Sequence, residues 1–442
     1  MFTKKQLIKL IIPLIIEQIL AVAVGMVDII MIAKAGESAV SGVSLVDTLN
    51  VLLINIFSAL ATGGAVVSAQ YLGQKKQDKA CKSANQLLLT TAVISFVIMI
   101  ISLIGNGLIL KLIYGNIDTH VMNNARIYFY ITAISFPFLA AYNSCAALFR
   151  AMGNSKVSMV VSIFMNVIHI IGNAIFLYVF HMGVAGVAIS TLLARAVATI
   201  VILILIRNKE NPIHIDSIFH LGYDWTMIKR ILHIGVPNGL ENSIFQVGKI
   251  LVQGLIASFG TAAITANAVA NTIAGIECTP GAAIGLAMIT VVGQCIGAND
   301  YQQAKKYAVK LMKLTYLIML LVNIAVIIFR NPIIGIYHLS AETAAITLQL
   351  VIFHSILCGL FWPASFTLPN ALRAASDVRF TMFTAILSMW LFRIVLSFIL
   401  GKFLGLGVFG VWIAMSIDWL FRSICFIVRF IGGKWKLHAI ID

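Results

Sequence analysis

The chain has 442 residues, of which 60% are hydrophobic and 11% charged, and its mean hydropathy is +1.00. A soluble globular domain is about half apolar and a quarter charged, so the composition excludes a soluble protein and also a single anchor on a soluble catalytic domain. The net charge of +15 does not indicate a nucleic-acid partner, because the cytoplasmic loops of membrane proteins collect Lys and Arg.

Twelve apolar stretches follow one another along the chain, and each is long enough to cross a bilayer as a helix of about 20 residues. The first continues from Ile8 past Met31 with no small-residue cleavage site, which favours an uncleaved span over a signal peptide. We therefore expect an all-α integral membrane protein with transmembrane helices at 6–33, 39–70, 84–110, 122–149, 157–180, 184–206, 227–258, 262–294, 308–329, 343–371, 380–402 and 407–430.

The distribution of Lys and Arg predicts the orientation of these spans. If connections alternate between the two sides, 22 of the 31 Lys and Arg residues lie on the side of the N-terminus and five on the other. Cytoplasmic loops carry the excess of positive residues. We expect a multi-pass protein of the plasma membrane with both termini in the cytoplasm.

The two halves of the chain resemble each other at an offset of 224 residues, at which Pro13 and Glu17 match Pro237 and Glu241. The repeat contains six spans, an even number, so both copies enter the membrane from the same side as parallel repeats. The predicted domains are an N-terminal lobe, a cytoplasmic linker and a C-terminal lobe, at 1–206, 207–225 and 226–442. Two such bundles around a midplane site are typical of alternating-access transporters.

Ionisable residues inside the spans are the candidates for function, because burying them in a bilayer is costly. The first half holds three acids and one base, and the second half holds equal numbers of both. The residues are Glu17, Asp28, Asp47 and Arg195 in the first half, and Glu241, Lys249, Glu277, Arg393, Asp418 and Arg422 in the second. Internal pairing satisfies the second set, whereas the first set needs an external cation, which a proton or a metal ion supplies.

Asp28 is the strongest single candidate, because it interrupts an otherwise apolar run in the first span. The alternative is a carboxylate hydrated at the outer interface or paired with Lys34. Asp47 lies closer to the boundary, where an interfacial role is equally plausible. Glu17 follows Pro13 by one helical turn, and pairing with Arg195 is an open alternative to a functional role.

Polar side chains on the fifth and sixth spans form a second group of candidates. His169 and Asn173 are four residues apart and share a helical face, and Thr191 lies on the next span. Such residues usually provide hydrogen bonds between helices, although the Asn173 oxygen is also a ligand for a cation at Asp28. The six cysteines are singly spaced, without the pattern of metal or redox motifs, and are predicted to be small packing residues.

Motifs of soluble catalysis are missing from the sequence, which lacks H-E-x-x-H, G-x-S-x-G and the P-loop pattern. We therefore expect no enzyme and no cofactor. The energy for transport then comes from an ion gradient, with H⁺ or Na⁺ as the coupling ion.

The stretches PLIIEQILAVAVGMVDIIMIAKAGESAVSGVSLV, FSALATGGAVVSAQYLG and GQCIGANDYQQAKK resemble the multidrug and toxic compound extrusion (MATE) family. The resemblance covers nearly the whole chain. It implies two six-helix bundles forming a V-shaped cleft, and antiport of organic, often cationic, compounds against Na⁺ or H⁺. It also implies that Asp28, Asn173 and Thr191 bind the coupling ion, with Na⁺ at Asp28 as the candidate metal site. His169 stands where relatives often have Asn, and the tenth span lacks the acid that some members use in the second lobe.

Two functions follow from these observations. The first is export of small organic cations by a monomer in the lipid bilayer, with Asp28, Asn173, Thr191, Asp47 and His169 at the ion site. The second is a flippase for a lipid-linked saccharide of the same superfamily, whose pyrophosphate would need a basic cleft including Arg195, Arg393 and Arg422. The remaining deep charges are assigned to the substrate cleft or to a buried charge network: Glu17, Arg195, Glu241, Lys249, Glu277, Arg393 and Asp418.

Overall fold

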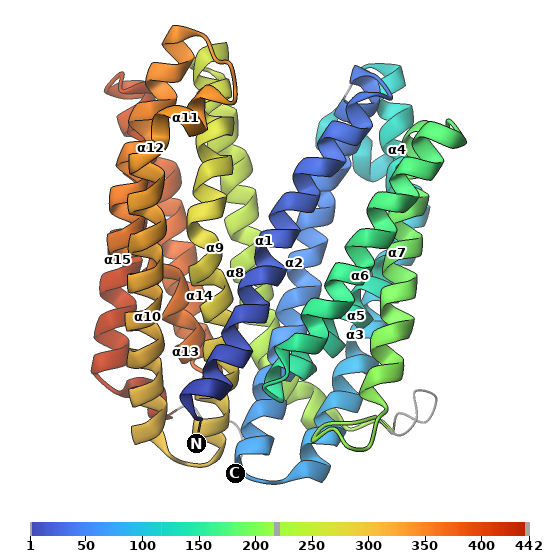
Figure 1. Ribbon diagram of the computed structural model, residues 1–442, viewed down its shortest axis with the longest axis vertical. Coiled ribbons are helices and arrows are strands. Elements are labelled where there is room, and N and C mark those ends of the chain that lie inside the picture. Colours follow the sequence, from blue (N-terminus) through green and yellow to red (C-terminus); the bar gives the residue numbers. More distant parts are fainter. Residues whose placement is uncertain (1, 116, 216–221, 438–442) are drawn as a thin grey trace. The chain divides into compact units, whose positions relative to one another are not determined.

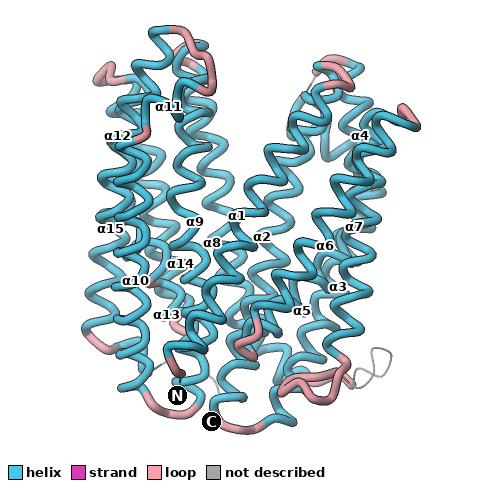
Figure 2. Tube along the Cα trace, viewed as in Figure 1, coloured by secondary structure: helices cyan, strands magenta, loops and turns pink. Residues whose placement is uncertain are grey.

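The computed structural model describes residues 2–115, 117–215 and 222–437. All regular secondary structure in these residues is helical (Figure 2). The chain forms two compact units, one from Thr3 to Gly239 and one that begins at Leu240 and includes Phe2. The predicted linker 207–225 ends in the first unit, and its residues 216–221 lie outside the described part.

The first unit is built from seven membrane segments (Figure 1). The fourth segment is two helices bent by 49°, and the fifth ends in a short π-helix. The segments are α1 (Lys4–Ala33), α2 (Glu37–Gly73), α3 (Gln77–Tyr114), α4 (Thr119–Ile134) with α5 (Phe136–Ala151), α6 (Ser155–Ala174) with η1 (Ile175–Val179), α7 (Gly183–Ile206) and the first part of α8 (Trp225–Ala257).

The second unit continues from α8 (Figure 1). Its helices are α9 (Thr261–Gly297), α10 (Tyr301–Ile328), the short α11 (Arg330–Gly335), α12 (Ala341–Trp362) with η2 (Pro363–Thr367) and α13 (Pro369–Ala374), α14 (Val378–Ser388) with η3 (Met389–Val395) and η4 (Phe398–Phe403), α15 (Gly407–Ile431) and η5 (Lys434–Leu437).

Each of the twelve predicted stretches corresponds to one helical segment. In the described residues ten helices are long and apolar enough to span a membrane, or eleven when α4 and α5 count as one span. The remaining segment is α8, whose apolarity is lowered by Glu241 and Lys249. Helices α3 and α10 begin several residues before the predicted stretches, because polar first turns extend them; Asp300 caps α10 by accepting from the Gln303 backbone N–H at 2.8 Å.

The backbone repeats at the same offset as the sequence. Gly36 and Gly260 precede α2 and α9 with φ of 100° and 97°, and Gly183 and Gly407 begin α7 and α15 with φ of 54° and 56°. Positive φ strains residues that carry a Cβ, so glycine is favoured at these turns. The equivalent glycines therefore enforce equivalent entries into the helices of the two halves.

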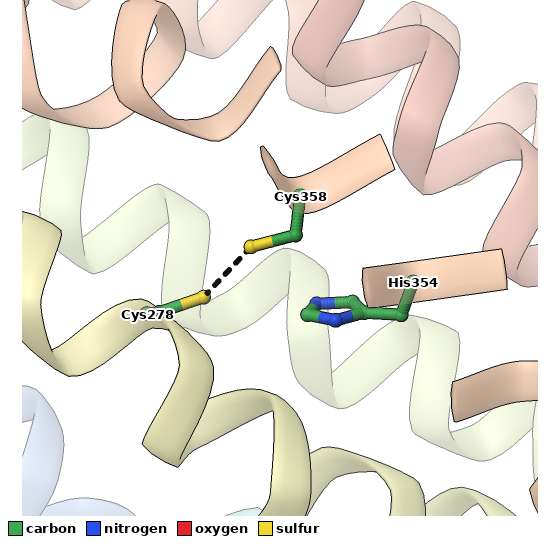
Figure 3. Close-up of side chains that lie close together, drawn as sticks. All are labelled: Cys278, His354 and Cys358. Atoms are coloured by element: carbon green, nitrogen blue, oxygen red, sulfur yellow. Dashed lines mark hydrogen bonds between the residues drawn. The ribbon is translucent and has the colours of Figure 1, made fainter. Parts of the chain in front are cut away.

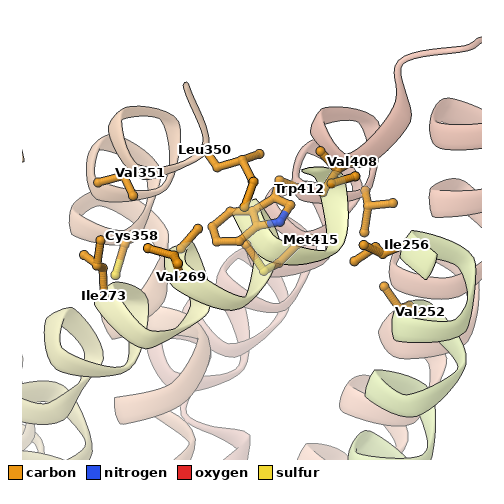
Figure 4. Close-up of a cluster of buried hydrophobic side chains, with 14 of the residues drawn as sticks. Val252, Ile256, Val269, Ile273, Leu350, Val351, Cys358, Val408, Trp412 and Met415 are labelled. Carbon is orange, nitrogen blue, oxygen red and sulfur yellow. The ribbon is translucent and has the colours of Figure 1, made fainter. Parts of the chain in front are cut away.

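Apolar packing inside each unit fixes the helices that carry the candidate residues. In the second unit Val269, Leu350, Trp412 and Met415 pack together between α9, α12 and α15 (Figure 4). The indole N–H of Trp412 donates to Asn267 Oδ1 at 2.9 Å. Burial of such side chains inside a bundle excludes lipid as well as water, so polar groups in these cores depend on each other for partners.

The described part of the connection between α7 and α8 packs onto the first unit. Ile213 and Ile215 are fully buried. Lys82 Nζ lies 2.6 Å from Asp224 Oδ2, and the Met227 backbone N–H donates to the same carboxylate at 3.1 Å. The hydrogen bond from Lys82, followed by that from Met227, lowers the pKa of Asp224 below its ordinary value.

Candidate functional site

Close packing of α6 against α7 positions the first candidate site. A Cβ on Gly172 would lie 2.5 Å from Ser190 Oγ, so the glycine permits an approach that a larger residue would block. Across this contact the Ser190 hydroxyl donates to the His169 backbone carbonyl at 2.7 Å. His169 on α6 is thereby held opposite Thr191 on α7.

A chain of polar contacts links these helices to Asp28 on α1. Asn173 Nδ2 donates to Asp28 Oδ1 at 3.0 Å, and His169 Nδ1 lies 3.7 Å from the same oxygen. The other imidazole nitrogen, Nε2, is 3.1 Å from Thr191 Oγ1 and 3.4 Å from Asn173 Nδ2. The structure therefore brings together four of the five predicted ion-site residues from three helices.

This cluster is largely withdrawn from solvent but remains accessible. The side chain of Asp28 is 31% exposed and that of His169 is 13% exposed, whereas Asn173 is fully buried. Asn173 Oδ1 has no hydrogen-bond partner among the described residues. A buried acceptor without a partner is costly, and here it provides a second oxygen close to a carboxylate that a cation reaches.

Asp47 and Arg195 border the cluster. Asp47 on α2 is exposed, its Oδ1 accepts from Asn50 Nδ2 at 3.4 Å, and it is close enough to Asp28 for the two carboxylates to repel each other. Arg195 Nη1 donates to Ser135 Oγ at 2.7 Å and attracts Asp47 through its charge. The arginine therefore compensates part of the surplus negative charge without an ion pair to Asp28 in the described contacts.

Two alternatives for the acids of the first unit are changed by this geometry. Glu17 lies 3.4 Å from Arg150 and accepts from Ser158 at 3.0 Å, so its partner is Arg150 and not Arg195. The sequence analysis did not consider Arg150, because it lies at the end of a predicted span. The Lys34 ammonium lies 4.9 Å from the ring centroid of Tyr178, and the described ion pairs include none between Lys34 and Asp28.

The deep charges of the second unit are mostly paired with one another. Glu241 Oε1 is 2.7 Å from Arg373 and 3.5 Å from Arg422. Asp418 accepts from the Ser388 hydroxyl and lies 3.7 Å from Arg393. These contacts describe a charge network inside the bundle, in which Arg373 is a member that the sequence analysis missed.

Glu277 and Lys249 occupy separate environments in this unit. Glu277 Oε2 is 2.5 Å from His354 Nδ1, and its other oxygen accepts from Ser355. Lys249 lines a cavity of about 50 Å³ together with Arg393 and the amides of Asn267 and Asn271. The depth of His354 in the tenth predicted span was the signal that should have marked it as the partner of a buried acid.

Comparison with known proteins places the chain in a family. The family model described as MatE matches residues 13–175 and, a second time, residues 237–399. The chain belongs to the MatE family. The two matches are offset by the predicted 224 residues, so they confirm the internal repeat.

Named relatives extend the MatE assignment to nearly the full length. The chain is 26% identical over 429 residues to the uncharacterized transporter YisQ of Bacillus subtilis, covering 96% of this chain and 93% of that protein. It is 25% identical over 449 residues to the probable multidrug resistance protein NorM of Thermotoga maritima, covering 99% and 94%. The family is thus one of transporters and not of enzymes.

Solved structures confirm the fold class of this MatE protein. An outward-facing multidrug resistance MATE family transporter of the MOP superfamily superimposes with a TM-score of 0.90 at 18% identity, covering 99% of this chain and 96% of that one. A MOP superfamily transporter from Pyrococcus furiosus, described as having a binding pocket of reverse polarity, gives 0.89 with the same coverage. The protein is therefore an all-α, multi-pass membrane transporter built from two repeats.

Proposed function

We propose that this MatE protein exports small organic cations from the cytoplasm by antiport against a coupling cation carried by Asp28. The observation that supports the proposal is the contact between Asp28 and Asn173, together with the unpartnered Asn173 oxygen. The names of relatives such as NorM, a probable multidrug resistance protein, supply the substrate class.

The chemistry of the proposed coupling follows from the position of the carboxylate. An anionic side chain at membrane depth is stabilised by taking up a proton or by binding a cation. Occupancy by the ion and occupancy by a cationic substrate then compete for the same negative charge in the first unit. If the two six-span repeats alternate in the side to which they open, an inward ion drives an outward substrate.

The immediate neighbours of Asp28 favour a proton over Na⁺. The closest groups are nitrogens, Asn173 Nδ2 at 3.0 Å and His169 Nδ1 at 3.7 Å, whereas a hard cation such as Na⁺ prefers oxygen ligands. On protonation of Asp28, rotation of the Asn173 amide would present its oxygen as the acceptor for the new carboxyl proton.

The proposed orientation places both termini in the cytoplasm of the plasma membrane, with the 22 Lys and Arg residues of one side facing inward. Efflux then runs from the cytoplasm outward. We also propose that the monomer is the transporting unit, since the chain itself contains both repeats.

The flippase alternative is weaker because its basic cleft is largely consumed by internal contacts. Arg422 lies near Glu241 and Arg393 near Asp418, which leaves little uncompensated positive charge for a pyrophosphate. Arg195 is directed at Ser135 and lies among the acids of the first unit.

The test combines cells with purified protein. Cells that express the transporter should exclude a cationic dye such as ethidium, and the protein should not rescue a strain that lacks its lipid-linked saccharide flippase. In proteoliposomes loaded with the dye, a pH gradient imposed alone should drive efflux, and a Na⁺ gradient imposed alone should not. Efflux driven by neither gradient, or rescue of the flippase strain, contradicts the proposal.

A further inference from the structure

Two thiols and an imidazole meet inside the second unit, away from the proposed ion site of the first. Cys278 comes from α9, and His354 and Cys358 come from α12 (Figure 3). One ligand atom from each residue lies within 4.8 Å of those of the other two. His354 and Cys358 are four residues apart, so they share one face of α12.

The spacing of the sulfurs matches that of a tetrahedral metal site. Cys278 Sγ and Cys358 Sγ are 3.8 Å apart. Two thiolates at about 2.3 Å from a tetrahedral zinc ion are separated by about 3.8 Å, whereas the sulfurs of a disulfide are about 2.0 Å apart. The two side chains thus already have the separation that a shared ion would require.

A second layer of contacts orients the imidazole as in known histidine metal ligands. Glu277 Oε2 lies 2.5 Å from His354 Nδ1, which leaves Nε2 for the ion, and the Ser355 hydroxyl donates to the other Glu277 oxygen. The rings of Trp412 and Trp419 pack edge to face on the imidazole, each at 5.4 Å between centroids. A carboxylate on the remote nitrogen fixes the tautomer and strengthens the ligand.

A buried amide next to the thiols also lacks a partner. Asn323 on α10 is 1% exposed, lies beside the Cys358 thiol, and neither its Oδ1 nor its Nδ2 has a hydrogen-bond partner among the described residues. A zinc site with three protein ligands keeps a fourth position open. The Asn323 oxygen is the nearest group for that position.

We propose that Cys278, His354 and Cys358 bind one thiophilic transition-metal ion, Zn²⁺, with the Asn323 oxygen at the fourth position. Thiolate and imidazole ligands select zinc over the hard cations Mg²⁺ and Ca²⁺. On binding, each thiol gives its proton to solvent as its sulfur bonds the ion, and the imidazole binds in its neutral form. The Lys249 ammonium, close enough to act on Cys278, and the Glu277 carboxylate then bring the net charge of the loaded site to zero.

The corresponding prediction from the sequence was different, because no cysteine pair had metal-site spacing. The ligands are 80 residues apart along the chain, and only the packing of α9 against α12 brings them together. The proposal is independent of the antiport mechanism, since it concerns the second unit and binding alone. Zinc would cross-link α9 to α12 close to Pro280, where α9 lacks a backbone donor.

Cobalt is the first probe for the site. The full-length protein in detergent, reduced and stripped of metals with a chelator, is titrated with Co²⁺. We expect one ion per chain and a sulfur-to-cobalt charge-transfer band, which Zn²⁺ abolishes by displacement. Cys278→Ser, Cys358→Ser and His354→Gln should each weaken Zn²⁺ at least 100-fold, and Glu277→Gln should weaken it about 10- to 100-fold. Cys145→Ala, a buried lone cysteine of the first unit, is the matched control and should bind as the wild type does.

X-ray absorption on the zinc-loaded wild type keeps the test valid if a variant fails to fold. The proposal requires two sulfur neighbours at about 2.3 Å and a nitrogen at about 2.0 Å. A shell of oxygen and nitrogen alone, the absence of a charge-transfer band in folded wild type, or equal binding by the cysteine variants would overturn it.

Discussion

Glu241 Oε1 and Arg373 Nη2 lie 2.7 Å apart in the second unit, and these two residues are the repeat equivalents of Glu17 and Arg150, whose closest atoms are 3.4 Å apart in the first. In both units a glutamate one turn after a proline is neutralised by an arginine from a helix end. The repeated ion pair explains why two of the six deep acids need no external cation.

The second-unit pair should be the more costly to break. Replacing Arg373 with Gln leaves Glu241, which is 4% exposed, with Arg422 as its remaining partner. Removing one member of a buried pair costs about 3–5 kcal/mol, so we expect a large loss of thermal stability in detergent. Arg150→Gln is the matched control and should lose less, because the first-unit side chains are more exposed, at 16% and 12%. Equal losses in the two variants would contradict this view.

Helix contact at Gly172 should be sensitive to one methyl group. In Gly172→Ala the new Cβ would meet Ser190 Oγ at 2.5 Å, and overpacking of this kind costs about 1–3 kcal/mol. Gly275→Ala is the control, since a Cβ there meets nothing within 4 Å, and it should be neutral or gain up to about 1 kcal/mol in helix propensity. Thermal unfolding of the two variants measures the difference. The added substitution Ser190→Gly should restore part of the loss, and no difference between the two single variants would refute the close approach.

The contact between Lys82 and Asp224 predicts a pH dependence outside the membrane segments. The pKa of Asp224 is lowered in the folded protein, so its stabilising effect is present above the unfolded pKa of about 3.9 and disappears as the pH falls through the folded value. At pH 7 the wild type should melt slightly above Asp224→Asn, by at most about 1 kcal/mol for a surface pair. The two melting curves should converge near pH 2. A difference that persists at that pH would point to helix capping and not to charge.

Transport should depend on Asp28 more than on any other acid of the first unit. Asp28→Asn keeps the size of the side chain but removes the charge, so we expect dye efflux from proteoliposomes to fall to that of empty vesicles while folding is retained. Asp118→Asn serves as the control, because Asp118 caps α4 by accepting from backbone N–H groups and Asn caps helices equally well. Normal efflux by Asp28→Asn would remove this residue from the mechanism.

The membrane segments and the repeat were predictable from the sequence because both depend on local composition and on matching residues. Long apolar runs define spans whatever their tertiary contacts, and the offset of Pro13 and Pro237 is visible in the sequence alone. The bend between α4 and α5 and the π-helical turns such as η3 were not predicted, since they depend on how neighbouring helices pack.

Partner choice was the part of the site that the sequence did not determine. Asp28, Asn173 and Thr191 were singled out by polarity and by family resemblance, and the structure brings them together around His169. The pairing of Glu17 with Arg150 and of Glu277 with His354 depends on contacts between helices more than 70 residues apart in the chain, which hydropathy and spacing do not encode.

The most direct test of the central claim is ion movement driven by substrate. Purified protein is reconstituted into vesicles that contain a pH-sensitive dye, and a cationic substrate is added outside without an imposed gradient. We predict that substrate uptake releases protons from the lumen for the wild type and releases none for Asp28→Asn. Proton release by Asp28→Asn equal to that of the wild type would contradict the assignment of the coupling ion to this carboxylate.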